Sequence, residues 1–104
     1  MLIQHAEKLC STFANHSDSR TKKARVLLKR LFQPHDPGVK IKKDSEGTFQ
    51  LRVQGSQRGS LWYPQITSSN AFCTCPDHVE RGVLCKHIRA AAGALVYRHR
   101  KSQA

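Results

Sequence analysis

Three of the four cysteines and two of the six histidines fall in one short stretch, CTCPDHVERGVLCKH, which runs from Cys73 to His87. Cys73 and Cys75 are two residues apart, and Cys85 and His87 repeat this spacing ten residues later. Strand residues two apart point to the same side, so both thiolates of the first pair can face one ion. The two pairs together offer three sulfurs and one nitrogen, a closed tetrahedral set typical of structural zinc.

Two other residues are candidates for the ligand set. His78 lies inside the stretch and could replace Cys73, because a CxxH spacing can also hold zinc. The alternative set is then Cys75, His78, Cys85 and His87. Cys10 is the fourth cysteine and lies far away among apolar neighbours. We interpret Cys10 as a small buried hydrophobic residue, not as a reactive thiol or a fifth ligand.

A catalytic ion is the other use of such a stretch. His78, Val79 and Glu80 superficially resemble the H-x-E sequence of zinc deaminases, but the P-C-x-x-C partner of that motif is missing. A hydrolytic zinc also keeps one position open for water, whereas four protein ligands close the shell. The sequence has no CxxC redox pair, phosphate-binding glycine loop or nucleophile elbow. We therefore expect one structural Zn²⁺ and no enzymatic activity.

A strand and a helix must position the two ligand pairs. The segment AFCTC, residues 71–75, predicts a strand, and apolar residues at a helical period predict a helix over residues 86–101. Between them, Pro76 and Gly82 predict a loop that turns the chain back. The helix then begins at the second ligand pair.

The segments upstream predict the rest of a small antiparallel sheet. The period changes to two from Val39 to Gln54, with a turn at DSEG, which indicates a hairpin. The segment LWYPQIT, residues 61–67, predicts a third strand in which Pro64 requires an edge or a bulge. Trp62 is the single tryptophan, and we expect it to fill the core rather than to stack on a base.

The N-terminal third predicts two helices. Apolar residues recur every three or four positions over residues 2–13 and again over about 20–33, and QPHDPG ends the second helix. The predicted fold class is α+β: an N-terminal helical hairpin, a small antiparallel sheet and a C-terminal helix joined by a structural zinc site. We divide the chain into a basic helical hairpin at residues 1–36, a zinc-binding module at 37–101 and a tail at 102–104.

The arrangement CxC, nine residues, CxH resembles the SWIM zinc finger. The resemblance continues beyond the ligands: CTCPDH is similar to the Cys-x-Cys-Pro-Asp-aromatic stretch of that family, and CKHIRAA to its Cys-Lys-His-Ile-x-Ala helix start. It covers about residues 49–97 and departs at His78, where the family has a larger aromatic residue, and at Pro64. It implies one zinc ion and a role in DNA binding or protein–protein contact, as an accessory part of transposases, helicases or recombination assemblies.

The chain is strongly basic, with 18 Lys and Arg against 7 Asp and Glu and a formal net charge of +11. Such a charge attracts polyanions, and nucleic acid is the leading candidate. An anionic membrane is the rival, but no run approaches the roughly 18 apolar residues of a spanning helix. The N-terminus lacks the pattern of a secretory signal. We therefore expect an intracellular protein, in the cytoplasm and nucleoid or in the nucleus, where clustered cysteines bind metal rather than form disulfides.

Basic residues on the second helix and around the zinc site are the candidate contacts to a nucleic-acid backbone. They are Arg20, Lys22, Lys23, Lys29, Arg30, Arg81, Lys86, Arg89 and Arg100. We predict a small zinc-binding accessory protein that binds nucleic acid, DNA in preference to RNA. Its partner would be a protein of a recombination, transposition or other nucleoprotein complex. The alternative is a zinc-stabilised adaptor for protein–protein interaction without direct nucleic-acid contact.

Overall fold

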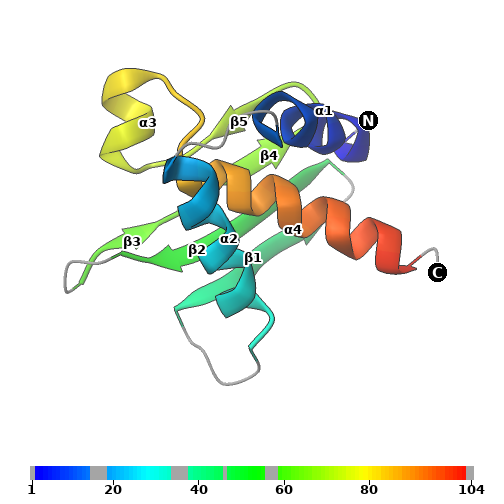
Figure 1. Cartoon of the computed structure of the whole chain (residues 1–104), viewed down its shortest axis with the longest axis horizontal. Coiled ribbons are helices and arrows are strands. Elements are labelled where there is room, and N and C mark those ends of the chain that lie inside the picture. Colours follow the sequence, from blue (N-terminus) through cyan, green and yellow to red (C-terminus); the bar gives the residue numbers. More distant parts are fainter. Residues whose placement is uncertain (1, 15–18, 34–37, 46, 56–58, 103–104) are drawn as a thin grey trace.

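The computed structural model describes residues 2–14, 19–33, 38–45, 47–55 and 59–102. Its helices are α1 (Leu2–Ala14), α2 (Ser19–Leu31), α3 (Pro76–Arg81) and α4 (Lys86–Ser102). Its strands are β1 (Val39–Ser45), β2 (Thr48–Gln54), β3 (Leu61–Trp62), β4 (Gln65–Thr67) and β5 (Ala71–Phe72). This combination of helices with one small antiparallel sheet confirms the predicted α+β class (Figure 1).

Strand β2 is the centre of the sheet. β1 pairs with one edge of β2, and β3 and β4 pair one after the other with its second edge. Pro64 separates β3 from β4, and its carbonyl accepts a hydrogen bond of 3.0 Å from the Leu51 amide. The predicted third strand is therefore interrupted, because proline has no amide hydrogen for the ladder. β5 pairs with β4 and is short, so the strand predicted over residues 71–75 ends at Phe72.

Helix α4 crosses one face of the sheet, with α1 on one side of it and α2 on the other (Figure 1). The two N-terminal helices both pack mainly against α4, so α4 is the main partner of each helix of the predicted hairpin. The four alanines of α4 between residues 90 and 94 are fully buried, so its neighbours approach closely. At Gly93, an added Cβ would lie 2.9 Å from Cδ1 of Leu28 in α2. Small side chains thus let one helix serve as the partner of two.

The main hydrophobic core lies between the helices and the sheet. It combines Phe49, Leu51 and Val53 of β2 with buried faces of α2 and α4. The predicted segments 1–36 and 37–101 both contribute to this core, and the boundary between them stays a prediction.

A second hydrophobic cluster adjoins the main core at the end of the sheet. It consists of the three cysteines of the ligand stretch and Ile88. Trp62 and Leu84 are half-buried and pack against both clusters, which agrees with the expected core role of the tryptophan. The ligand stretch is therefore continuous with the interior of the molecule.

Of the helices that the structure describes, none is both long and apolar enough to cross a membrane. α1 and α2 have 13 residues each, and the 17-residue α4 carries three basic residues in its last turn.

Candidate metal centre and basic surface

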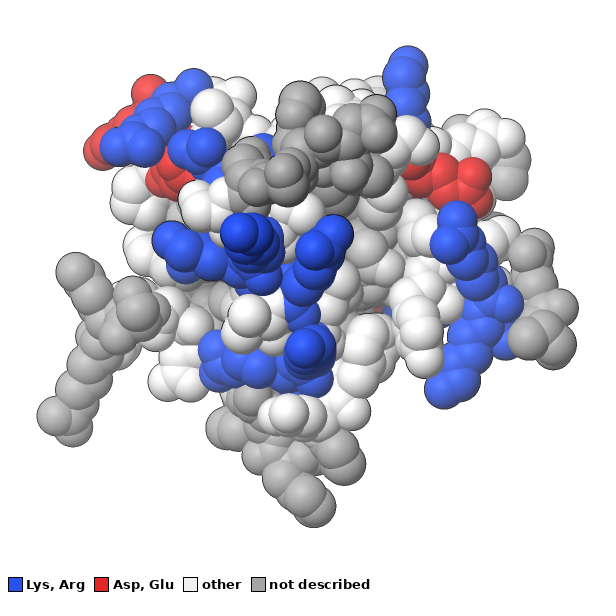
Figure 2. Space-filling view, in the orientation of Figure 1, with Lys and Arg blue, Asp and Glu red and all other residues white. Residues whose placement is uncertain are grey.

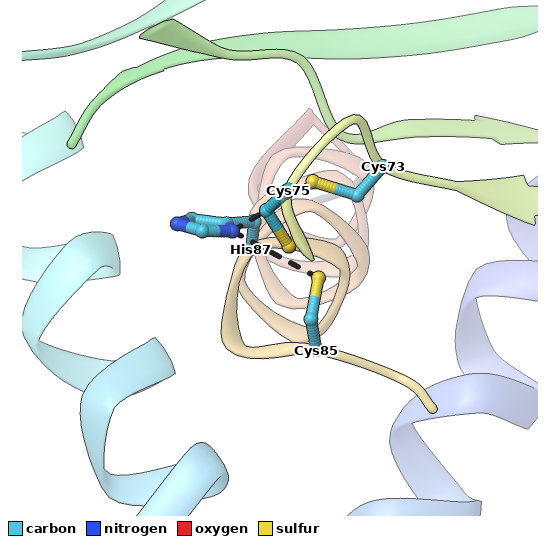
Figure 3. Close-up of side chains that lie close together, drawn as sticks. All are labelled: Cys73, Cys75, Cys85 and His87. Atoms are coloured by element: carbon cyan, nitrogen blue, oxygen red, sulfur yellow. Dashed lines mark hydrogen bonds between the residues drawn. The ribbon is translucent and has the colours of Figure 1, made fainter. Parts of the chain in front are cut away.

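The end of the sheet and the start of α4 bring the four predicted ligands together. Cys73 and Cys75 follow β5, whereas Cys85 and His87 stand at the start of α4. All four side chains are buried, and the exposed fractions of the residues are at most 4%. Their ligand atoms lie within 4.8 Å of one another (Figure 3). In the described part of the chain, this is the one group of at least three Cys, His, Asp or Glu side chains placed to hold a metal ion.

The distances within this group fit a tetrahedral zinc site. Nδ1 of His87 lies 3.7 Å from Sγ of Cys73 and 3.8 Å from Sγ of Cys85. Zinc with bonds of about 2.3 Å to sulfur and about 2.0 Å to nitrogen separates such atoms by about 3.5 Å at the tetrahedral angle. The donor set and its spacing therefore fit one Zn²⁺ in a closed Cys₃His shell, with Nδ1 as the ligand atom of His87.

The three thiols differ in how readily they ionise. A hydrogen bond with Cys85, together with burial, raises the pKa of Cys73, and burial raises the pKa of Cys75. The same hydrogen bond from Cys73 is the main cause that lowers the pKa of Cys85, to about 4. These directions make Cys85 the most acidic thiol of the cluster, whereas Cys73 and Cys75 hold their protons more tightly and release them when they bind zinc.

His78 and Cys10 lie outside this cluster. Nδ1 of His78 is 2.9 Å from the carbonyl oxygen of Val83, and its ring packs edge-on against Phe72 with 5.4 Å between the centroids. The structure thus supports the ligand set with Cys73, not the alternative with His78. Cys10 is half-buried on α1 and burial raises its pKa, which fits its predicted role as a small hydrophobic residue.

The segment between the ligand pairs contains a short helix where the sequence predicted only a loop. Pro76 stands at the start of α3, where its missing amide hydrogen is not needed, and Gly82 ends the helix with a φ of 66°. The Gly82 amide donates a hydrogen bond of 2.8 Å to the carbonyl of His78. The two residues interpreted as turn formers therefore mark the two ends of a helix.

An ion pair fixes α3 against α2. Arg20 donates from Nε to Oδ2 of Asp77 at 2.8 Å and from Nη2 to Oδ1 at 3.0 Å. Arg81 lies 3.5 Å from the same carboxylate. The hydrogen-bonded guanidinium of Arg20 lowers the pKa of Asp77. This two-bond contact connects α2 to the segment that carries the zinc ligands.

A closed Cys₃His site that joins the edge of a sheet to the start of a helix defines a structural zinc finger. Residues 65–95 match the family model of the SWIM zinc finger, and all four ligands lie within that match, so the chain contains a SWIM zinc finger with one zinc site. This confirms the resemblance seen in the sequence. No curated protein and no solved structure matches the chain.

The solvent-facing side of α2 is a basic surface. Four of its cations are exposed, and we call them the α2 basic face. They are Lys22, Lys23, Arg25 and Lys29. Figure 2 shows Lys and Arg side chains gathered over α2, with a second group over the C-terminal part of α4. Arg25 was not among the predicted contacts, although the helical period that places Lys22 and Lys29 outside also places Arg25 there.

Two predicted contacts have structural partners instead. Arg89 is 7% exposed and donates from Nε to the Leu84 carbonyl at 2.7 Å and from Nη1 to Oγ1 of Thr21 at 2.9 Å. It connects α4 to α2 in the interior, so a backbone contact at Arg89 does not fit the structure. Arg20 is occupied by its ion pair with Asp77. The contact of Arg20 with Asp77 holds α2 against α3, and the contact of Arg89 with Thr21 holds α2 against α4.

The other predicted contacts fall in separate places. Lys23, Arg30 and Lys86 line one hollow beside His87. Arg81 is exposed on α3, and Arg100 is exposed near the C-terminal end of α4, beside α1. The structure therefore gathers part of the predicted set around α2 and the start of α4, and leaves Arg100 apart.

Proposed function

We propose that this protein is a nucleic-acid-binding accessory protein that binds DNA in preference to RNA. The observation that carries the proposal is the α2 basic face, on a chain with a net charge of +11. α2 has 13 residues and is about 20 Å long, so its exposed cations can reach several phosphates of one backbone. Its contacts would position the protein without reading base sequence.

The zinc site supports this surface and is proposed to have no catalytic role. Four protein ligands leave no position for a reacting water. The site orders the segment that carries Asp77, and Asp77 holds α2 through Arg20. We propose that the protein acts inside the cell beside an enzyme of a nucleoprotein complex, such as one of recombination or transposition.

Binding to duplex DNA measured across salt concentrations tests this function. If each of the four cations neutralises one phosphate of B-DNA, log K falls with log salt concentration at a slope of about −3.6. A steep loss of affinity with added salt is the expected result. No binding to duplex or single-stranded nucleic acid at low salt would contradict the proposal and favour the protein adaptor.

A pair of matched double variants tests the surface. Lys22→Glu with Lys29→Glu reverses two charges of the α2 basic face, and Lys40→Glu with Lys43→Glu makes the same change at exposed positions of β1. We expect the first pair to weaken DNA binding and to make the salt slope shallower by about 2, while the second has a small effect. Equal losses in both would show that net charge alone attracts DNA and would remove α2 from the interface.

A further inference from the structure

The zinc-binding histidine presents its second ring nitrogen away from the metal. In Figure 3, the ring of His87 extends from the sulfur atoms with Nδ1 toward them and Nε2 at its outer end. A metal bond at Nδ1 leaves the ring proton on Nε2, because the neutral imidazole carries one proton. In a loaded site, Nε2 of His87 is therefore a hydrogen-bond donor with a fixed direction.

Two hollows meet at this ring. One, of about 400 Å³, lies between α2 and the start of α3, and the other, of about 370 Å³, lies between α2 and the end of β2. Four residues line both of them and define what we call the zinc-site groove. They are Lys23, Trp62, Lys86 and His87.

Nε2 of His87 opens into this groove. The residue is 4% exposed, and within the described part of the chain its hydrogen-bond contacts involve Nδ1 alone. Yet none of the fully buried side-chain nitrogens described there lacks a partner. Nε2 is therefore not fully buried, and since His87 lines both hollows, a ligand in the groove can accept a hydrogen bond from Nε2–H. Metal-bound histidines usually donate this hydrogen bond to a carboxylate, a carbonyl or water.

The charge around the groove favours an anion. Lys23 and Lys86 line it from two elements, α2 and the start of α4. Asp77 lines the hollow between α2 and α3, and its carboxylate already contacts two guanidinium groups, those of Arg20 and Arg81. Among the described residues that line the groove, the two lysine ammonium groups therefore have no competing free carboxylate.

We propose that the zinc-site groove binds a phosphate of a single nucleic-acid strand, with Nε2–H of His87 as donor and Lys23 and Lys86 as the charges. The proposal rests on the proposed function and adds the kind of strand. A duplex keeps its bases paired and offers only its backbone, which the α2 basic face can contact from outside. A single strand can enter the groove and bring an unpaired base to the accessible part of Trp62.

The fluorescence of Trp62 tests the groove without any substitution, because it is the one tryptophan of the sequence. The zinc-loaded protein is titrated with an oligothymidylate of about 12 nucleotides and with a duplex of the same length, and binding is followed separately by the anisotropy of a labelled strand. We expect the single strand to quench Trp62 emission, while the duplex binds without this change. Binding of the single strand with unchanged Trp62 emission would overturn the proposal.

Two measurements assign the phosphate contacts. Lys86→Gln is expected to lower affinity for the single strand about tenfold and to change duplex binding little, since a hydrogen bond to a charged group is worth at least that factor. The control Lys29→Gln, on the α2 basic face outside the groove, should weaken both ligands alike. In ¹⁵N-histidine spectra, the Nε2–H signal of His87 should shift on saturation with oligothymidylate, and an unmoved signal would overturn its role as donor.

The same measurements distinguish loss of the groove from loss of nucleic-acid binding as a whole. No binding of either ligand at low salt would remove the nucleic-acid function itself. Binding of both ligands, with equal losses in Lys86→Gln and no change at Trp62, would leave the α2 basic face intact and refute the groove alone.

Discussion

Arg89 offers the sharpest test of the structure, because the sequence predicted a nucleic-acid contact there and the structure shows a buried connection. The change Arg89→Met keeps the length of the side chain and removes its charge and donors. Between residues that the structure describes, this change removes the hydrogen bonds to the Leu84 carbonyl and to the hydroxyl of Thr21. Both link α4 to its surroundings in the interior.

The size of the effect follows from these contacts. A hydrogen bond from a charged group contributes roughly 1.5–3 kcal/mol, so two of them amount to roughly 3–6 kcal/mol. Part of this is offset, because the methionine no longer requires a guanidinium to be desolvated. We expect a net loss of about 3 kcal/mol in the free energy of unfolding. For a domain of this size, Tm should then fall by roughly 15 °C.

Thermal unfolding followed by circular dichroism, on zinc-loaded protein, measures this loss. Arg25→Met is the matched control, because it removes the same charge from an exposed position of α2. The control should change stability by less than about 0.5 kcal/mol and reduce the salt slope of DNA binding by about 0.9. Arg89→Met, assayed below its Tm, should bind DNA as the wild type does. An unchanged Tm with weakened binding in Arg89→Met would refute the structural role of this arginine.

Three further predictions concern the zinc site and the sheet. Cys85→Ser should lose both its zinc, measured by atomic absorption, and its folded state. Binding of a structural zinc contributes about 10–16 kcal/mol, which is as large as the free energy of unfolding of a whole domain. A variant that is folded without metal would contradict this prediction. Because the pKa values of Cys73 and Cys75 are raised, each thiol releases a proton when it binds zinc. Zinc affinity, measured by competition with a chelator, should therefore fall by about hundredfold for each unit by which the pH falls near neutrality. A pH-independent affinity would show that both are already thiolates. Gly55→Ala would place Cβ 2.6 Å from Nε1 of Trp62. The free energy of unfolding in urea should therefore fall by about 1–3 kcal/mol. Wild-type stability in this variant would show that the end of β2 moves to make room for the methyl group.

The metal ligands could be predicted from the sequence because their signal is local. Residue type and a spacing of two within each pair are enough to direct four atoms at one ion once a strand and a helix flank them. The burial of Arg89 had no such signal, since it depends on Thr21, which lies 68 positions earlier in the chain. Arg89 meets this partner because α2 packs against α4 in the folded chain.

The errors in the fold have the same physical origin. Pro76 and Gly82 favour a turn, but they equally favour the first position and the left-handed cap of a helix, so their local signal could not distinguish the two. The apolar faces of α1 and α2 were predicted correctly as helical, while their common partner was not. The period of the apolar residues identifies the buried side of a helix but does not indicate which element covers that side.

The central place of α4 has a consequence for how the protein is made. On the ribosome, α1 and α2 emerge before every strand, yet the helix that covers them comes after the last strand. Although α2 also contacts β1 and α1 contacts β4, the larger part of both apolar faces stays uncovered in the nascent chain until α4 emerges, and such a state is prone to aggregation. The same segment delivers Cys85 and His87, so metal capture and closure of the helical layer become a single late event.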